Sequence, residues 1–194
     1  MNFPIRMTFK ILALAPQISV TDATGRMVLY VRQKAFKLSE SVTIFADAEQ
    51  TRRIATIEAD RVIDWSASYA IHDADGRLLG TVKRRGGRSL WRAHYEIESP
   101  DGSSMLVREA NPWVKVVDGI FGEIPVIGLL AGYAFHPAYR LLDATGSELF
   151  RTTKQPALFE GVYEMQQFVS AAEDRERLAV LAMLMVVLLE RARG

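Results

Sequence analysis

The chain has 194 residues, with 24 Lys and Arg against 23 Asp and Glu and a formal net charge of +1. So small a net charge excludes a global field that would attract nucleic acid or an anionic membrane, and any such binding requires a local patch. The absence of Cys excludes disulfides, thiol catalysis, Cys zinc sites and S-acylation. Hydrophobic residues make up 49%, which is enough for a large core, and the length predicts a single domain over residues 1–194.

Four short segments, each followed by strand-like sequence, share a turn pattern that begins with Asp or Ser and ends with Gly. An Asp or Ser opens a type I turn by bonding its own backbone, and Gly accepts the left-handed position that follows. The pattern predicts hairpins in a large antiparallel sheet. The four segments are residues 22–25, 73–76, 99–102 and 143–146.

The turn at residues 73–76, Asp-Ala-Asp-Gly, also has the opening of a calcium-binding loop. An EF-hand loop needs further oxygen ligands after this point, whereas Arg77, Leu78 and Leu79 follow here. The segment therefore predicts a hairpin turn and no calcium site.

Apolar and polar residues alternate along the segments between these turns, as they do in half-buried strands. In residues 91–98, Tyr95 and Ile97 share one face with Trp91 and Ala93, and charged or polar residues occupy the other. About a dozen segments of this kind occur, and so large an antiparallel sheet avoids exposed edges by closing into a barrel.

The best candidate for a functional site is the basic segment 83–88, which lies between two predicted strands and contains two glycines. A basic loop with glycines offers side chains and backbone N–H groups to a phosphate. The candidate anion- or lipid-binding residues are Lys83, Arg84, Arg85 and Arg88. The alternative is a solvated hairpin tip whose charges discourage edge-to-edge aggregation.

Residues 111–132 break the alternation, because they are apolar, rich in Gly and interrupted by Pro112 and Pro125. They predict either a loop that closes one end of the barrel or an exposed contact with a membrane or partner.

The last predicted element is a helix over about residues 171–191. Ser170 and Glu173 match a capping box, and residues 178–189 are apolar on every side, which indicates a helix buried all round. The apolar run covers about 18 Å, whereas a membrane-spanning helix needs roughly 20 apolar residues, so no transmembrane segment is predicted. We therefore expect the strands to surround this helix.

Several stretches resemble the LURP-one-related family, within the wider tubby C-terminal-like and phospholipid scramblase group. They are residues 30–38, 73–80, 95–97 and 151–159, together with the apolar C-terminal run. The resemblance implies an all-β barrel of about twelve antiparallel strands around a buried C-terminal helix. It also implies lipid-related functions, because the wider group includes phosphoinositide-binding membrane tethers and proteins proposed to move phospholipids.

No stretch of the sequence carries a catalytic signature. The three histidines, His72, His94 and His136, have no second ligand at metal-binding spacing. A nucleophile elbow, a phosphate-cradling Gly loop and a dinucleotide fingerprint are all missing. We expect no catalytic residues, no cofactor and no metal, and hence a protein that is not an enzyme.

The sequence therefore favours a non-enzymatic binding or scaffold module in the cytoplasm, peripheral at the inner membrane surface. Its expected partners are anionic phospholipid head groups such as phosphoinositides, or another protein, but not nucleic acid. Two alternatives stay open: a membrane-associated scramblase-like protein, which the missing acylation cysteines weaken, and an enzyme acting on a small ligand in a barrel-end cleft. The oligomeric state is open too.

Overall fold

The computed structural model of the chain describes residues 1–10, 17–32, 41–59, 68–85, 94–110, 137–157 and 160–191. Within these ranges it contains twelve β-strands and one helix, α3. The elements are β1 (Ile5–Lys10), β2 (Gln17–Thr21), β3 (Met27–Arg32), β4 (Ser41–Phe45), β5 (Arg53–Ala59), β6 (Ser68–Asp73), β7 (Leu78–Arg84), β8 (His94–Glu98), β9 (Ser104–Glu109), β10 (Ala138–Asp143), β11 (Glu148–Gln155), β12 (Glu160–Gln167) and α3 (Glu173–Arg191).

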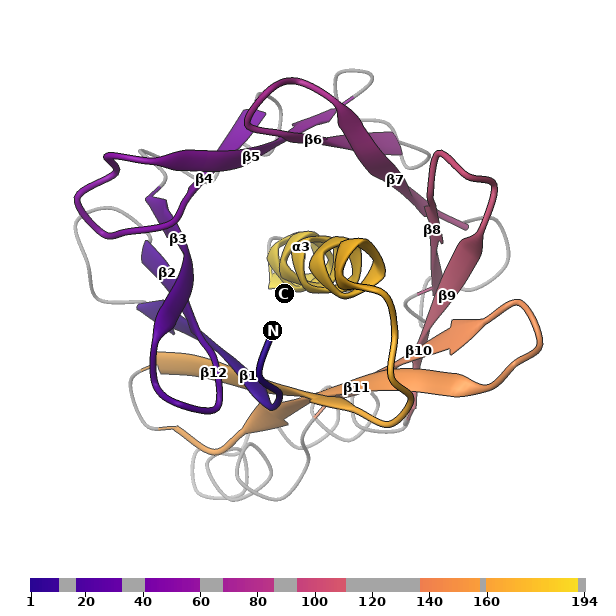
Figure 1. Cartoon of the computed structure of the whole chain (residues 1–194). Helices are drawn as coiled ribbons and strands as arrows, with labels where there is room; N and C mark the ends of the chain where they lie inside the picture. Colours follow the sequence, from indigo (N-terminus) through magenta and orange to yellow (C-terminus); the bar gives the residue numbers. More distant parts are fainter. Residues whose placement is uncertain are drawn as a thin grey trace.

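Each strand pairs antiparallel with the next strand along the chain, and β12 returns to pair with β1. The sheet is thus a closed barrel, and α3 runs through its interior (Figure 1). The predicted closed barrel of about twelve strands around a C-terminal helix is confirmed. Closure gives each of these twelve strands a neighbour on both sides, which limits edge-to-edge aggregation, although β3 and β4 pair only at Tyr30 and Phe45.

All four predicted Gly turns form. Gly25, Gly76, Gly102 and Gly146 have φ between +80° and +87°, a left-handed conformation that costs glycine little. In the first turn the Asp22 carboxylate accepts hydrogen bonds from the N–H groups of Thr24 and Arg26 at 3.0 and 3.2 Å. These turns, with residues 46–52, connect strands at the end of the barrel where α3 begins, which we call the turn rim.

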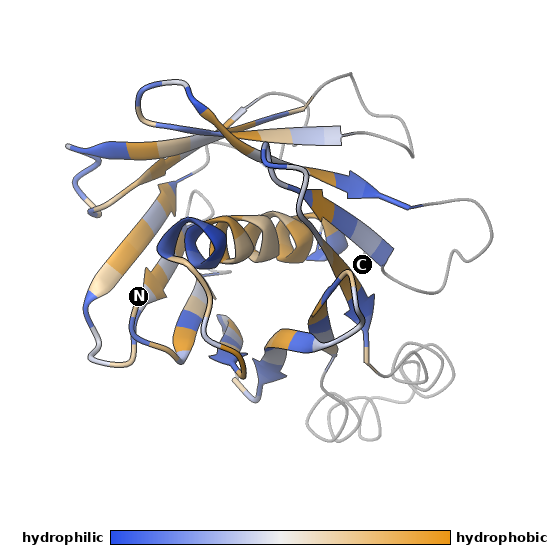
Figure 2. Cartoon of the chain, turned by 45° about the vertical axis from the view of Figure 1, so that its right-hand side comes forward, coloured by the Kyte–Doolittle hydropathy of each residue, from blue (hydrophilic) through white to orange (hydrophobic). Residues whose placement is uncertain are grey.

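The interior of the barrel is filled by α3. Residues 178–189 are all buried, with Leu184 completely inaccessible, and the hydrophobic colouring of the helix inside the barrel is clear in Figure 2. The prediction of a helix buried on every side is confirmed. Its apolar side chains contact the inner faces of the strands rather than lipid. Among the described residues, no helix combines the length and the hydropathy needed to cross a bilayer.

The start of α3 differs from the prediction. The helix begins at Glu173, and the carbonyl of Ala172 accepts the N–H of Glu176 at 3.0 Å, so Ala172 occupies the cap position. Ser170 therefore lies two residues before the cap, and the capping box predicted for Ser170 and Glu173 does not form. In the first turn, the Glu176 carboxylate instead accepts from the N-terminal ammonium of Met1 at 3.0 Å, a tertiary contact that holds this end of the helix.

The last turn of α3 is held by polar contacts with the strands. The Tyr95 hydroxyl donates to the Glu190 carboxylate at 2.8 Å, and the guanidinium of Arg191 lies 5.1 Å from the centre of the Phe9 ring. The absence of a side chain at Gly161 leaves the space that the Arg191 guanidinium occupies. Both ends of the helix are thus fixed to the barrel.

Candidate functional site

The residues predicted to bind anions do not share one orientation. Lys83 and Arg84 are the last residues of β7, where alternation places Val82 inside the barrel and Lys83 on the exposed outer face. Arg84 follows the inward pattern and is half-buried, while Arg85 is exposed. Arg88 lies outside the described residues. Of the four residues predicted to bind anions in this segment, only Lys83 and Arg85 are described and directed outwards.

Arg85 is already engaged by a carboxylate. Its Nε and Nη2 donate to the two oxygens of Glu96 at 2.7 and 2.8 Å, a bidentate pair between β7 and β8. The hydrogen bonds and the charge of Glu96 raise the pKa of Arg85. The Arg85 side chain is 63% exposed, so this surface pair fixes the direction of the guanidinium more than it stabilises the fold.

The strand register continues this basic site around the barrel. Arg85 lies opposite His94, because the N–H of Arg85 donates to the carbonyl of His94. On the following strands, His94 lies opposite Arg108, Arg108 opposite Arg140, and Arg140 opposite Arg151. Directly opposite residues on neighbouring strands have Cβ atoms about 4.5–5.5 Å apart. Four guanidinium groups therefore follow one register line across β7 to β11. We call Arg85, Arg108, Arg140 and Arg151 the arginine row.

The arginine row carries more positive charge than its neighbours neutralise. Glu148 accepts hydrogen bonds from Nε of Arg140 at 2.7 Å and from Nε and Nη2 of Arg151 at 2.6 and 3.0 Å. These bonds lower the pKa of Glu148, and the bond from Arg151 has the largest effect. Arg108 is exposed and has no hydrogen bond or ion pair with any residue that the structure describes. Together with Glu96, the row has four cations and two carboxylates.

Like charges directly opposite one another destabilise an antiparallel sheet. Arg140 has Arg108 on one side and Arg151 on the other, and Glu148 bridges only the second pair. The Arg108–Arg140 pair is thus uncompensated in the described structure. An anion bound between the two guanidinium groups would reduce their repulsion.

The sequence pattern indicates one end of this row, Arg85, but gives no sign of Arg108, Arg140 and Arg151 as binding residues. Counting outwards from the turn at residues 143–146 brings Arg140 close to Arg151, but a bulge between Leu141 and Leu142 shifts the register. No comparable count reaches Arg108 from Arg140, because residues 111–136 separate their strands. The sequence could therefore indicate the proximity of Arg140 and Arg151, but not that of Arg108 and Arg140.

The remaining candidate residues form no site in the described structure. No group of three or more potential metal ligands occurs among those residues. His72 lies on β6 opposite Thr56, and His94 begins β8. His136 and residues 111–132 lie outside the described residues, so the predictions for them are untested.

Comparisons with known proteins agree with this architecture. A crystal structure of a protein from Arabidopsis thaliana is similar, with a TM-score of 0.50, over 98% of this chain and 93% of that chain. The two sequences are 14% identical, so this similarity concerns the fold, and it agrees with the predicted tubby C-terminal-like barrel. A comparison with curated protein sequences gives no match. The family model described as LURP-one-related matches residues 8–118, and the chain belongs to this family.

Proposed function

We propose that this protein is a non-enzymatic binding module that binds anionic phospholipid head groups through the arginine row and the adjoining Lys83. The observation that supports it best is the Arg108–Arg140 pair, two like charges side by side on neighbouring strands with no carboxylate between them. An anion that contacts both guanidinium groups would remove their repulsion.

Phosphate is the anion that suits this geometry. The planar guanidinium group presents paired donors that match phosphate oxygens, and adjacent strands lie about 4.8 Å apart, so one phosphate reaches donors from two strands. A head group with several phosphates would contact several members of the row. Glu96 and Glu148 orient three of the arginines and leave Arg108 as the least neutralised centre of the row.

The proposal places the protein at the cytoplasmic membrane surface as a peripheral protein. Clustered Lys and Arg residues near an anionic leaflet contribute about 1 kcal/mol each, and this attraction falls off within a Debye length. Binding through the row should therefore be modest for each residue, additive across several of them, and sensitive to salt.

The test is vesicle flotation with the purified protein. Vesicles of phosphatidylcholine alone are compared with vesicles that also contain phosphatidylinositol bisphosphate, at low and moderate salt. The variant Arg108→Gln/Arg140→Gln should bind the anionic vesicles roughly thirtyfold more weakly, since two contacts of about 1 kcal/mol are lost.

The matched control is Arg6→Gln/Arg32→Gln, which removes the same charge from exposed positions on β1 and β3. This control should retain most of the binding. Equal losses in both variants would indicate unspecific attraction, and no binding by the wild type would refute the proposal. Competition by soluble inositol hexakisphosphate distinguishes recognition of a head group from recognition of a bilayer surface.

A further inference from the structure

The large apolar side chains that remain exposed in the described part of the chain all lie at the turn rim. They are Met1, Leu78, Phe168 and Val169. Phe168 and Val169 are consecutive, follow the end of β12, and are the most exposed of the four, at 54% and 46%. Single exposed apolar residues are ordinary on a protein surface, whereas two neighbours in one bend form a small contiguous patch. We call Phe168 and Val169 the apolar bend.

The apolar bend is held in place by the barrel. The N–H of Phe168 donates to the carbonyl of Leu149 at 2.9 Å, which continues the pairing of β11 with β12 by one residue. The guanidinium carbon of Arg151 lies 5.3 Å from the centre of the Phe168 ring, where a cation and an aromatic face attract each other. The ring is thus held next to Arg151 while more than half of it stays exposed.

The arginine row approaches the turn rim and ends at this bend. Arg85 lies beyond the end of β7 that is remote from the rim, whereas Arg151 lies in the half of β11 that is nearest to it. On β12, Gln166 lies opposite Arg151, and alternation along the strand places Phe168 on the same outer face as Gln166. Cations and apolar side chains therefore form one continuous surface across β10 to β12.

Positive charge is in excess beside the apolar bend. Arg140 and Arg151 share Glu148, the single carboxylate bonded to them in the described part of the chain, and Arg151 remains 44% exposed. Segments that lie at a membrane interface combine the same two features: basic groups meet the head groups, and aromatic and aliphatic side chains enter the boundary with the acyl chains. A protein partner typically covers about 800 Å² on each side, of which two half-exposed side chains supply little.

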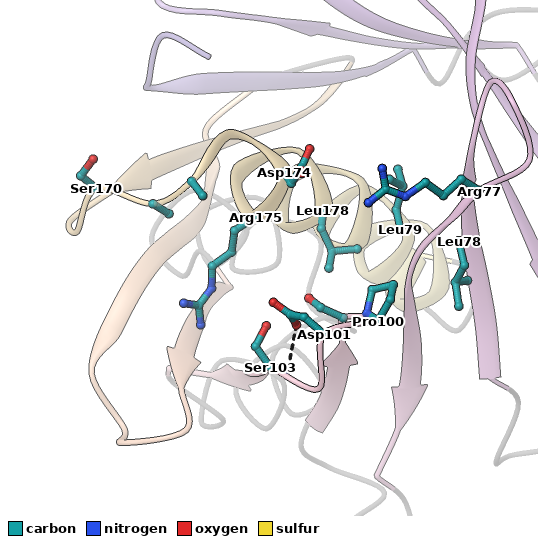
Figure 3. A pocket seen from close by; sticks show the side chains of 13 residues that line it. Arg77, Leu78, Leu79, Pro100, Asp101, Ser103, Ser170, Asp174, Arg175 and Leu178 are labelled. Carbon is teal, nitrogen blue, oxygen red and sulfur yellow. Dashed lines mark hydrogen bonds between the residues drawn. The ribbon is translucent and has the colours of Figure 1, made fainter.

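The far side of the turn rim differs in charge. Leu78 is exposed there, on β7, which Figure 1 shows across the barrel from β12. It lines a cavity of about 510 Å³ between the β6–β7 turn, the β8–β9 turn and the first turn of α3 (Figure 3). Two carboxylates, Asp101 and Asp174, line this cavity together with Arg77 and Arg175, so the charges balance. Nothing on this side attracts an anionic bilayer, which makes Leu78 a control for the apolar bend.

We infer that the protein meets an anionic bilayer with the side of the turn rim formed by β10 to β12, and that Phe168 and Val169 enter the boundary between head groups and acyl chains beside Arg151. The inference rests on the proposed function, because the arginine row supplies the attraction to the anionic leaflet. It adds the residues that contact the hydrocarbon part of the lipid. Recognition of a soluble inositol phosphate would need the row but not the apolar bend.

The first experiment compares two ligands. Flotation with vesicles of phosphatidylcholine and phosphatidylinositol bisphosphate measures binding to a bilayer, and calorimetric titration with inositol hexakisphosphate measures binding to the row alone. Phe168→Ser/Val169→Ser should bind the vesicles roughly tenfold more weakly, since two half-exposed side chains no longer leave water, and should bind inositol hexakisphosphate like the wild type. Leu78→Ser should bind both ligands like the wild type, and Arg108→Gln/Arg140→Gln should lose affinity for both.

A second measurement follows the bend without weakening binding. The chain contains no Cys, so Val169→Cys and Leu78→Cys each accept a single label. An environment-sensitive dye at residue 169 should brighten and shift to shorter wavelengths on adding the anionic vesicles, and lipids with a quencher high on the acyl chain should quench it. The same dye at residue 78 should not respond.

The outcomes separate this inference from the proposed function. No binding of either ligand by the wild type would refute both. Vesicle binding that falls in Arg108→Gln/Arg140→Gln but not in Phe168→Ser/Val169→Ser, with a label at residue 169 that stays in water, would refute the insertion alone and leave the apolar bend as a contact for a protein. Equal responses at residues 169 and 78, or loss of inositol hexakisphosphate binding in the apolar-bend variant, would also overturn it.

Discussion

Replacing Gly80 by Ala tests how closely α3 approaches the wall of the barrel. An added Cβ at this position would lie 2.6 Å from the backbone oxygen of Glu98 and 2.9 Å from both terminal carbons of Leu178. Cβ atoms essentially never lie within 3.0 Å of another non-bonded heavy atom in folded proteins, so either β8 or the helix must shift. Gly80 is buried on β7, and Leu178 is 2% exposed, which leaves little room for such a shift.

Overpacking of a well-packed core costs about 1–3 kcal/mol, and the lower entropy of the unfolded chain with Ala returns about 0.4–1 kcal/mol. We therefore expect Gly80→Ala to lower the free energy of unfolding by about 1–2 kcal/mol. In a chain of this size that corresponds to a fall in Tm of about 2–8 °C. Urea denaturation followed by circular dichroism, together with a thermal scan, measures both quantities.

A double-mutant cycle identifies the cause. Leu178→Ala removes the side-chain part of the clash, so Gly80→Ala should cost less in that background than in the wild type. Gly102→Ala is the control: its added Cβ meets nothing within 4 Å, its cost arises from a φ of +82°, and it should not couple to Leu178. A neutral or stabilising Gly80→Ala would refute the close approach of helix and strand described here.

Three further predictions concern the helix and the turns. Leu184→Asp buries an unpaired charge at a completely inaccessible position and should cost more than about 4 kcal/mol, so that the variant is unfolded by circular dichroism; an unchanged Tm would contradict the buried helix. Arg191→Gln removes the cation from the Phe9 ring and should lower stability by about 0.5–2 kcal/mol in urea denaturation, with hydrogen exchange rising first in the last turn of α3. The hydroxyl and N–H of Thr24 hold the pKa of Asp22 below its ordinary value of 3.8. The ionised carboxylate therefore stabilises the fold above pH 3.8, and this stability is lost as the pH falls through the lower pKa of the folded state. Asp22→Asn should therefore lose less stability than the wild type between pH 5 and about pH 2, and equal losses would contradict this.

The sequence by itself determined those features that depend on neighbouring residues. Gly76 and its three counterparts predict turns because a left-handed residue is needed at a fixed distance from an Asp or Ser that can bond its own backbone. The apolar residues 178–189 predict a buried helix because no face of that helix suits water. From these two signals a barrel filled by its last helix follows.

Only the tertiary structure decided which strand positions share a register line. Arg108 and Arg140 are separated by a long segment, and no local preference of either residue indicates that they face each other across β9 and β10. The same holds for Arg77 and Arg175, which line one cavity at the turn rim because α3 begins beside the β6–β7 turn. Pairing between distant segments depends on closure of the whole sheet, and closure is a property of all twelve strands at once.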